Sequence, residues 1–378
     1  MFKLLTLVGA RPQFIKSAAI SRTIRNYFSG KIEEVLVHSG QHYDSHMSDL
    51  FFQELDLLHP KHKFDLKTSS HSSQTSEIIQ CLDLVIQKES PQAILVYGDT
   101  NTTLAGALVA SKSNIPLIHI EAGLRSFNKT MPEEINRVLT DHCSSLLFCS
   151  GQSAIDYLAN EGIVHSNTGE CSVDAPKVFK CGDIMYDNSM YFSQKMSEDN
   201  YVPISSFKNF LLFTMHRPSN TDKPKRLQAI CQMLMTFSTQ QLKKIVFPLH
   251  PRTKKALEES LDHQLLFAFL NHPWIEVIQP VSFKEMISLQ RSCDFVITDS
   301  GGVQKEAYFF EKPCLILRPE TEWIQIIDQG AAILVDAELE DLTKKYNVLS
   351  KSDIKYPKLF GDGNSSHFIC HTILEELS

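Results

Sequence analysis

A short turn that contains a serine and two glycines combines residue types that can bind an anion. Ser300, Gly301 and Gly302 follow an apolar segment, 294–298, that predicts a strand, and they precede 303–310, which predicts a helix. Such a turn can point several backbone N–H groups at one anion, which the helix dipole also favours. Because glycine has no Cβ, a diphosphate can approach this backbone closely. The pattern predicts a nucleotide-diphosphate site, with a glycine-rich turn that only caps a helix as the structural alternative.

Glu306 lies one helical turn further on, where a carboxylate could accept hydrogen bonds from two ribose hydroxyls. The whole pattern stands in the second half of the chain. The fingerprint of ordinary dinucleotide enzymes usually opens the first βα unit, so its position here argues against such an enzyme.

Acidic residues follow two predicted strands of the first half and begin one of its helices. Asp99 and Glu121 stand at strand ends, the latter directly after the apolar run 116–120, and Glu133 follows Pro132 at a predicted helix start. Three carboxylates in one cleft would raise the pKa of at least one of them, as proton-transfer catalysis requires. An N-cap role for Asp99 and a purely helix-starting role for Glu133 are the structural alternatives.

Basic and polar residues stand after the other predicted strands. Arg11 and Lys16 follow the first strand and could both face an anion at a helix start. Gln41 and His42 lie in a polar turn after the second strand, which could contact a ligand or only stabilise itself by hydrogen bonds. Solvated strand ends are the alternative for the whole set, which comprises Arg11, Lys16, His216, Arg217, His250, Arg252 and Arg318.

Short apolar runs alternate with helical patterns twice along the chain, which predicts parallel sheets with helices on both faces. The runs are nearly continuous in Val, Ile, Leu and Phe, as expected for strands covered on both faces. The predicted strands are 2–9, 33–39, 93–98, 116–120, 146–149, 177–181, 209–214, 244–249, 275–279, 294–298, 313–317 and 331–335. The predicted helices are 13–28, 45–57, 74–88, 101–112, 133–143, 152–161, 224–238, 253–261, 283–291, 302–310 and 337–347.

A polar segment near 190–208 separates the two series, and 378 residues exceed what one core usually supports. We therefore expect an α/β fold of two Rossmann-like doubly wound domains facing a cleft, with ligands outside the carboxyl ends of the strands. The expected parts are an N-terminal domain with the carboxylates, a linker, a nucleotide-binding domain and a C-terminal helix that packs back on the first domain. Their ranges are 1–190, 191–208, 209–360 and 361–378.

The bulk composition excludes several classes of protein. A net charge of −7 gives no global basic field for nucleic acid or an anionic membrane. No apolar run reaches the length of a membrane span, and the N-terminus predicts no signal peptide, so we expect a cytoplasmic protein. The nine cysteines are scattered without a C-x-x-C pair, which predicts buried thiols and no zinc.

Taken together, these motifs resemble the non-hydrolysing UDP-N-acetylglucosamine 2-epimerase family, whose members have the two-domain GT-B fold. The resemblance spans Leu5 to about Gly330. Each motif alone is weak, but their order and spacing are specific. They are GARPQFIK at 9–16, GDTNTTLAGA at 98–107, HIEAGLRS at 119–126, PEEINR at 132–137, the single His216, HPR at 250–252 and TDSGGVQKEA at 298–307.

The resemblance implies inversion at C2 of a UDP-2-acetamido sugar without a redox cofactor. In the family, UDP leaves C1 as the C2 proton is removed, and the 2-acetamidoglucal then takes UDP back while the opposite face of C2 is protonated. Such a reaction needs acid–base groups on two faces of the ring and a firm hold on the diphosphate. It also implies a homodimer that makes precursors of cell-surface polysaccharide, with no nucleic acid or membrane as partner.

By resemblance, Asp99, Glu121 and Glu133 match the catalytic carboxylates, and His216 matches the essential histidine near the diphosphate. No metal or cofactor is implied. The expected substrate-binding residues are Arg11, Lys16, Gln41, His42, Arg137, His250, Arg252, Ser300, Gly301, Gly302, Glu306 and Arg318.

The chain departs from the family pattern at two places. Pro218 follows His216-Arg217, and Trp323 replaces the arginine of the common Thr-Thr-Glu-Arg-Pro-Glu stretch. Together with the SGQHYD turn at 39–44, the second departure looks more like the branch that acts on UDP-2,3-diacetamido-2,3-dideoxy-glucuronate. That sugar, a GT-B glycosyltransferase, a hydrolysing epimerase and a non-enzymatic sugar-nucleotide sensor are the alternatives to a UDP-N-acetylglucosamine 2-epimerase.

Overall fold

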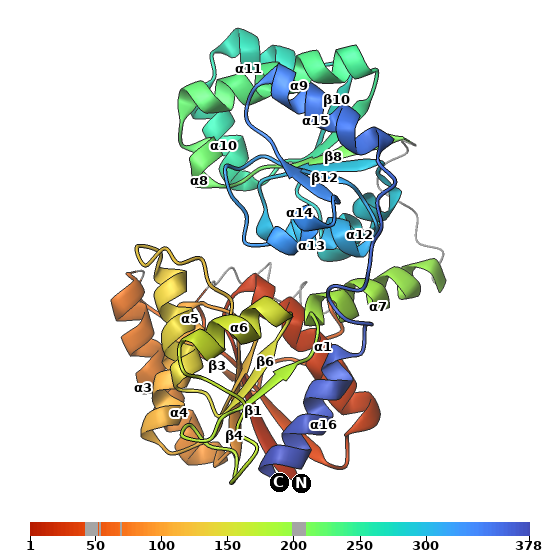
Figure 1. The fold of residues 1–378 in the computed structure, drawn as a ribbon. Coiled ribbons are helices and arrows are strands. Elements are labelled where there is room, and N and C mark those ends of the chain that lie inside the picture. Colours follow the sequence, from red (N-terminus) through yellow and green to blue (C-terminus); the bar gives the residue numbers. More distant parts are fainter. Residues whose placement is uncertain (42–51, 53, 69, 199–208) are drawn as a thin grey trace. The chain divides into compact units, whose positions relative to one another are not determined.

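The computed structural model describes residues 1–41, 52, 54–68, 70–198 and 209–378 (Figure 1). The chain forms two compact units, one over Met1–Met190 and Lys358–Ser378 and the other over Tyr191–Pro357. Each unit contains one parallel sheet with helices packed on it. Within the described part of the chain, no helix is both long and apolar enough to cross a membrane.

The first unit is built on a seven-stranded sheet in the order β3-β2-β1-β4-β5-β6-β7, with every neighbouring pair parallel. The strand order reverses between β1 and β4. In open α/β sheets, ligands bind outside the carboxyl ends of the strands at such a reversal. The strands are β1 Phe2–Val8, β2 Ile32–His38, β3 His62–Lys63, β4 Ala93–Tyr97, β5 Leu117–Ile120, β6 Leu146–Cys149 and β7 Lys177–Lys180.

Helices cover this sheet so that its apolar strands are buried. The helices of the unit are α1 Arg11–Tyr27, α3 His71–Glu89, α4 Asn101–Lys112, α5 Pro132–His142, α6 Gln152–Asn160 and α16 Ser365–Leu377. Helix α7, Ile184–Glu198, begins in this unit and continues past Met190 into the residues of the second unit. Alternate residues of β1 and β4 pack with α3 and α4 in one core cluster. Figure 1 shows α3, α4 and α5 side by side and α16 against α1. Thr23 donates to Ser366 at 2.9 Å, which ties the C-terminal helix to α1.

The second unit repeats the design with six parallel strands in the order β10-β9-β8-β11-β12-β13. Its strand order reverses between β8 and β11. The strands are β8 Phe210–Thr214, β9 Lys244–Pro248, β10 Ile275–Ile278, β11 Phe295–Thr298, β12 Cys314–Ile316 and β13 Ala332–Leu334.

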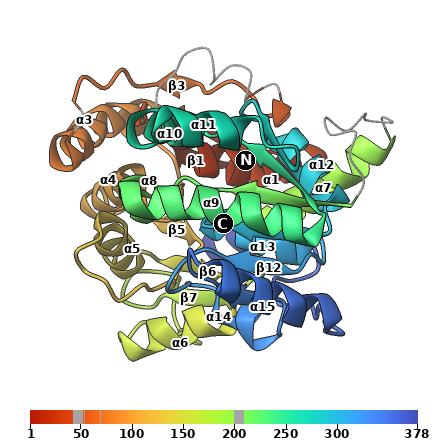
Figure 2. The same ribbon diagram turned by 90° about the horizontal axis from the view of Figure 1, so that it is seen from above.

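The helices of the second unit are α8 Pro218–Thr221, α9 Pro224–Gln241, α10 Pro251–Ser260, α11 His263–Leu270, α12 Phe283–Ser292, α13 Gly301–Phe309, α14 Ile324–Asp328 and α15 Leu339–Lys351. Helix α9 lies beside α10, α11 and α15 (Figure 2). Its apolar side joins theirs and strands β8, β9 and β11 in one core cluster.

All twelve predicted strands are confirmed, with ends that differ by at most one residue. Strand β3 and helices α7, α8, α11 and α14 were not predicted as elements. Of the helix predicted over 45–57, residues 45–51 and 53 lie outside the described residues.

The polar segment taken as the start of a linker is helical as far as Glu198, since α7 runs over Ile184–Glu198. The prediction of a linker rested on the polar residues after Tyr191 and did not take account of the apolar residues within and just before that segment. Met185, Phe192 and Met196 are buried and stand at spacings of seven and four, which place them on one helical face. Without glycine or proline in this stretch, nothing interrupts the helix.

Candidate functional site

The turns after β1 and β4, where the first sheet reverses its order, are fastened together by Gln13. Its side-chain oxygen accepts from the backbone N–H groups of Gly9 and Ala10 at 2.8 and 3.1 Å. Its amide nitrogen donates to the Tyr97 carbonyl at 2.8 Å. Gln13 is buried, so these bonds hold the start of α1 rigidly beside the turn that carries Asp99.

Four charged side chains meet at this edge of the sheet in two ion pairs. Lys16 from α1 pairs with Glu121 after β5, and Arg137 from α5 pairs with Asp99 after β4. A Cβ added at Gly98 would lie 3.3 Å from Glu121 Oε2 and 3.5 Å from Lys16 Nζ. A glycine at this position therefore leaves room for the pair.

The electrostatics of this cluster favour a carboxyl group that can hold a proton. Burial raises the pKa of Asp99 above its usual value, and the charges of Glu121 and Glu133 raise it further. Arg137 and Lys16 act in the opposite direction but do not reverse the shift. A carboxyl with a raised pKa beside a second carboxylate is suited to proton transfer.

Glu121 has a left-handed backbone, with φ of 71°, which is uncommon for a residue other than glycine. Its own N–H and that of Ala122 both donate to the Phe148 carbonyl, at 3.1 and 3.0 Å. Strained backbone of this kind persists where the surroundings fix it and is frequent in active sites. The bonds therefore hold the Glu121 carboxylate at the sheet edge in one conformation.

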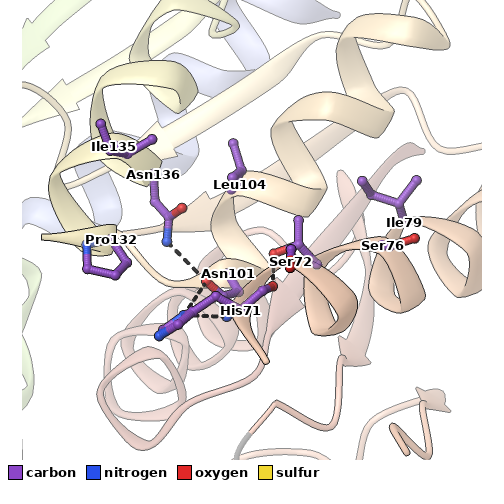
Figure 3. A pocket seen from close by; sticks show the side chains of 10 residues that line it. His71, Ser72, Ser76, Ile79, Asn101, Leu104, Pro132, Ile135 and Asn136 are labelled. Carbon is purple, nitrogen blue, oxygen red and sulfur yellow. Dashed lines mark hydrogen bonds between the residues drawn. The ribbon is translucent and has the colours of Figure 1, made fainter. Parts of the chain in front are cut away.

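Glu133 is exposed in the first turn of α5 and lies close enough for its charge to act on Asp99. Three residues on, Asn136 donates to the Asp99 carbonyl at 2.9 Å and to Asn101 Oδ1 at 3.3 Å. Figure 3 shows Asn136 and Asn101 at a pocket of about 470 Å³, lined also by His71 and Ile135. The N-terminal turns of α4 and α5 are thus joined behind Asp99.

The other predicted residues of the first unit have mixed positions. Arg137, expected to bind substrate, also donates to Glu134 at 2.8 Å. Gln41 uses its side-chain oxygen to accept from Thr102 N–H and Oγ1, at 2.9 and 2.7 Å. Arg11 is exposed in the first turn of α1. His42 lies outside the described residues.

In the second unit, the serine–glycine turn opens helix α13 as predicted. Ser300 is the N-cap, and its hydroxyl accepts from the Val303 N–H at 3.4 Å. The first N–H groups of a helix have no acceptor within it, so those of Gly301 and Gly302 are not used by the backbone of α13. A Cβ added at Gly302 would meet nothing closer than Ser300 Oγ at 3.9 Å, which leaves this backbone open.

Gly301 has a different neighbour, which the sequence analysis did not identify. A Cβ added there would lie 2.3 Å from Glu322 Oε1, so the glycine admits that carboxylate to the helix start. Glu322 accepts from Arg318 at 2.7 Å and lies 3.5 Å from Arg217 Nη2. Burial acts to raise the pKa of Glu322, but the charges of Arg318 and Arg217 act against it, and the net effect is a lowered pKa. The i,i+4 spacing of Arg318 and Glu322 was the available sequence signal.

His216 stands after β8 on a backbone held by the buried carboxylate of Asp299. Asp299 accepts from the N–H groups of His216 and Arg217, each at 3.0 Å. The desolvated position of the imidazole lowers its pKa, Asp299 opposes this, and Arg217 and Arg252 lower it further. A neutral imidazole with arginines around it is suited to donate to an incoming anion.

The remaining predicted residues of this unit surround the same strand ends or lie behind them. The His250 ring is 5.8 Å from that of His216, and Arg252 pairs with Asp222 at 2.8 Å. Glu306 is buried and accepts from Gln290 at 2.7 Å. The Glu306 carboxylate is therefore engaged by Gln290 within the unit.

Trp323, one of the two departures from the family pattern, is buried. The ammonium group of Lys305 lies 4.4 Å from the centre of its indole ring. Within the described ranges, no group of three or more His, Cys, Asp or Glu side chains could hold a metal ion.

Comparisons with known proteins identify the family of this chain. The model of the UDP-N-acetylglucosamine 2-epimerase family matches residues 27–374. A Methanococcus maripaludis protein named as a homologue of that enzyme is 42% identical, over 96% of this chain and 97% of its own length. A UDP-2,3-diacetamido-2,3-dideoxy-D-glucuronate 2-epimerase of Pseudomonas aeruginosa is also 42% identical, with the same coverage of the two chains.

A solved structure extends the similarity to the fold. The Methanocaldococcus jannaschii UDP-GlcNAc 2-epimerase, crystallised with UDP-GlcNAc and UDP, matches with a TM-score of 0.84 and 35% identity. The match covers 99% of this chain and all of that one. The chain therefore belongs to the UDP-N-acetylglucosamine 2-epimerase family.

Proposed function

We propose that the protein is a non-hydrolysing UDP-N-acetylglucosamine 2-epimerase that interconverts UDP-GlcNAc and UDP-ManNAc. The observation that carries the proposal is the Asp99–Glu121 cluster, where one carboxyl has a raised pKa beside another carboxylate. Together with a helix start suited to a diphosphate, it supplies both parts of an elimination. Family membership supports the same reaction.

The reaction balances without an oxidant or a metal ion. A carboxylate takes the C2 proton as the C1–O bond to UDP breaks, which leaves 2-acetamidoglucal and UDP. A diphosphate oxygen of UDP then attacks C1 while a carboxylic acid returns a proton to the opposite face of C2. We assign the proton transfers to Asp99, Glu121 and Glu133, since the charges of Glu121 and Glu133 both act on Asp99.

The second unit would hold the leaving group. We assign the diphosphate to the N–H groups of Gly301 and Gly302, with Arg217, Arg318 and His216 as the cationic or donor side chains. The negative charge of the diphosphate would raise the pKa of His216 again, so the imidazole could protonate UDP as it departs. The remaining predicted contacts stay part of this proposal: Arg11, Lys16, Gln41, His42, Arg137, His250, Arg252, Ser300 and Glu306.

UDP-2,3-diacetamido-2,3-dideoxy-glucuronate is the second candidate substrate, with the same mechanism. It is supported by the 42% identity to the Pseudomonas aeruginosa epimerase that is named for this sugar. We further propose that the enzyme acts as a homodimer in the cytoplasm and supplies precursors for cell-surface polysaccharide.

The test is to incubate the purified protein with each UDP-sugar and identify the products by NMR. The account predicts UDP-ManNAc from UDP-GlcNAc. If only the diacetamido-uronate is converted, that sugar is the substrate and UDP-GlcNAc is not. If free sugar is released together with UDP, the reaction is hydrolysis and not epimerisation. Asp99→Asn should abolish epimerisation and spare UDP binding, whereas Asp83→Asn, which changes an exposed aspartate on α3, should leave both unchanged.

A further inference from the structure

His119 is a fully buried histidine of β5, two residues before Glu121, that the proposed proton transfers do not use. Its Nε2 lies 2.8 Å from the carbonyl oxygen of Gly98, the residue before Asp99. Its Nδ1 lies 2.7 Å from Oδ1 of Asp141 on α5. One imidazole thus bridges the turn after β4 and the helix that carries Glu133.

The partners of the ring determine where its protons are. A carbonyl oxygen can only accept, so Nε2 must carry a hydrogen. Asp141 also accepts from Arg125 at 2.7 Å and from the Gly123 N–H at 3.2 Å. Burial acts to raise the pKa of Asp141, but the bonds from His119 and Arg125 act against it, and the net effect is a lowered pKa. The Nδ1 atom of His119 is bonded to this same carboxylate.

Arg125 extends this network beyond the pair. It makes two further bonds to Glu161, each at 2.7 Å. Asp141, His119 and the guanidinium of Arg125 are almost completely buried. A buried network whose groups are all bonded is rigid, and it fixes the elements from which its members come.

These contacts join the turns that carry the predicted acids. The Gly98 N–H donates to the Ile120 carbonyl at 3.0 Å, and His119 holds the Gly98 carbonyl. Asp141 holds the Gly123 N–H, two residues after Glu121. The backbone on both sides of Glu121 and directly before Asp99 is thereby fixed to α5.

We propose that His119, bonded through both ring nitrogens, is a positioning residue that sets the Asp99 and Glu121 carboxylates for proton transfer at C2. The proposal rests on the proposed epimerase function. His119 lies behind these turns, so its contribution is to orientation and not to binding of the diphosphate, which we assign to the second unit.

The test compares His119→Gln with His142→Gln. Glutamine presents a carbonyl oxygen to one of the two acceptors, so one bond of the bridge is lost. His142 stands at the end of the same helix, is 48% exposed in its side chain and lies 3.5 Å from Glu161. For His119→Gln we expect a fall in kcat of at least thirtyfold per folded molecule, with KM and the Kd for UDP within twofold of wild type. His142→Gln should match wild type throughout.

A merely structural role would lower the folded fraction and leave kcat per folded molecule unchanged, and that result would overturn the proposal. A rise in KM or in the Kd for UDP that accounts for the whole loss would do the same. If wild type epimerises neither UDP-sugar, the proposed function fails. If wild type is active and both variants match it, only the role of His119 fails.

A spectroscopic measurement keeps the proposal testable should His119→Gln not fold. In wild-type protein with ¹⁵N-labelled histidine and ¹³C-labelled glycine carbonyls, His119 is identified by coupling across its hydrogen bond to Gly98. Its Nε2 should carry a slowly exchanging proton. No coupling to Gly98, or a ring without a proton on Nε2, would contradict the proposal.

Discussion

The Gly302→Ala variant distinguishes a turn that binds a ligand from a turn that only caps a helix. In the ligand-free protein the new Cβ has no neighbour closer than Ser300 Oγ at 3.9 Å, so the change creates no clash. Alanine is favoured over glycine within a helix by up to about 1 kcal/mol, so the free energy of unfolding should stay the same or rise slightly. A turn that only caps α13 would show no other effect.

Bound UDP changes the expectation. A phosphate oxygen that accepts from the backbone lies about 2.9 Å from the nitrogen. A methyl carbon in contact with that oxygen must stay about 3.5 Å away from it. If the new Cβ keeps the oxygen out of its position, one charge-assisted hydrogen bond is lost. That loss weakens binding by about 2 kcal/mol, or about thirtyfold in Kd.

Calorimetric titration with UDP measures this loss, and thermal unfolding measures stability. Gly30→Ala is the matched control, because an added Cβ there has no neighbour within 4 Å and the residue lies in the first unit, outside the predicted site. Its UDP affinity should equal that of wild type. If Gly302→Ala binds UDP within twofold of wild type, the assignment of the diphosphate to this turn is wrong.

Two further substitutions test the electrostatics of the first unit. Lys16→Met removes a charge that lowers the pKa of Asp99, so the acidic limb of the pH profile of kcat/KM should move to higher pH; a shift to lower pH would contradict the cluster. Glu89 is buried with its pKa lowered to about 2 by Lys61 and His62, and such a carboxylate stabilises the fold above the pKa of the unfolded chain. Glu89→Gln should therefore lower the free energy of unfolding by about 3 kcal/mol at pH 7. Urea titrations should show this difference shrinking as the pH falls from 4.5 towards 2, and a constant difference would refute the reasoning.

The sequence predicts most of the fold because its signals are local. Continuous apolar runs mark the buried parallel strands, and residues such as Pro132 or Ser300 mark where helices begin. Helix α7 was missed because three buried side chains in a polar stretch carry the periodicity, and β3 because two residues carry no pattern.

The site is less predictable, because its chemistry depends on contacts between distant segments. Asp99 and Glu121 could be named as acids from their strand ends. Their pairing with Arg137 and Lys16 depends on which strands are neighbours. The same holds for the approach of Glu322 to Gly301, which opens α13, and for the bridge that His119 makes between Gly98 and Asp141. No short motif connects either set of residues.

The central claim is that carboxylates of the first unit exchange the C2 proton as UDP leaves and returns. The most direct measurement is epimerisation in D₂O, with the position of the label read by NMR. The account predicts that the UDP-ManNAc formed carries one deuterium, at C2, and that recovered UDP-GlcNAc gains the same label with time. An epimer that keeps its original C2 hydrogen, or no exchange with either UDP-sugar, would contradict it.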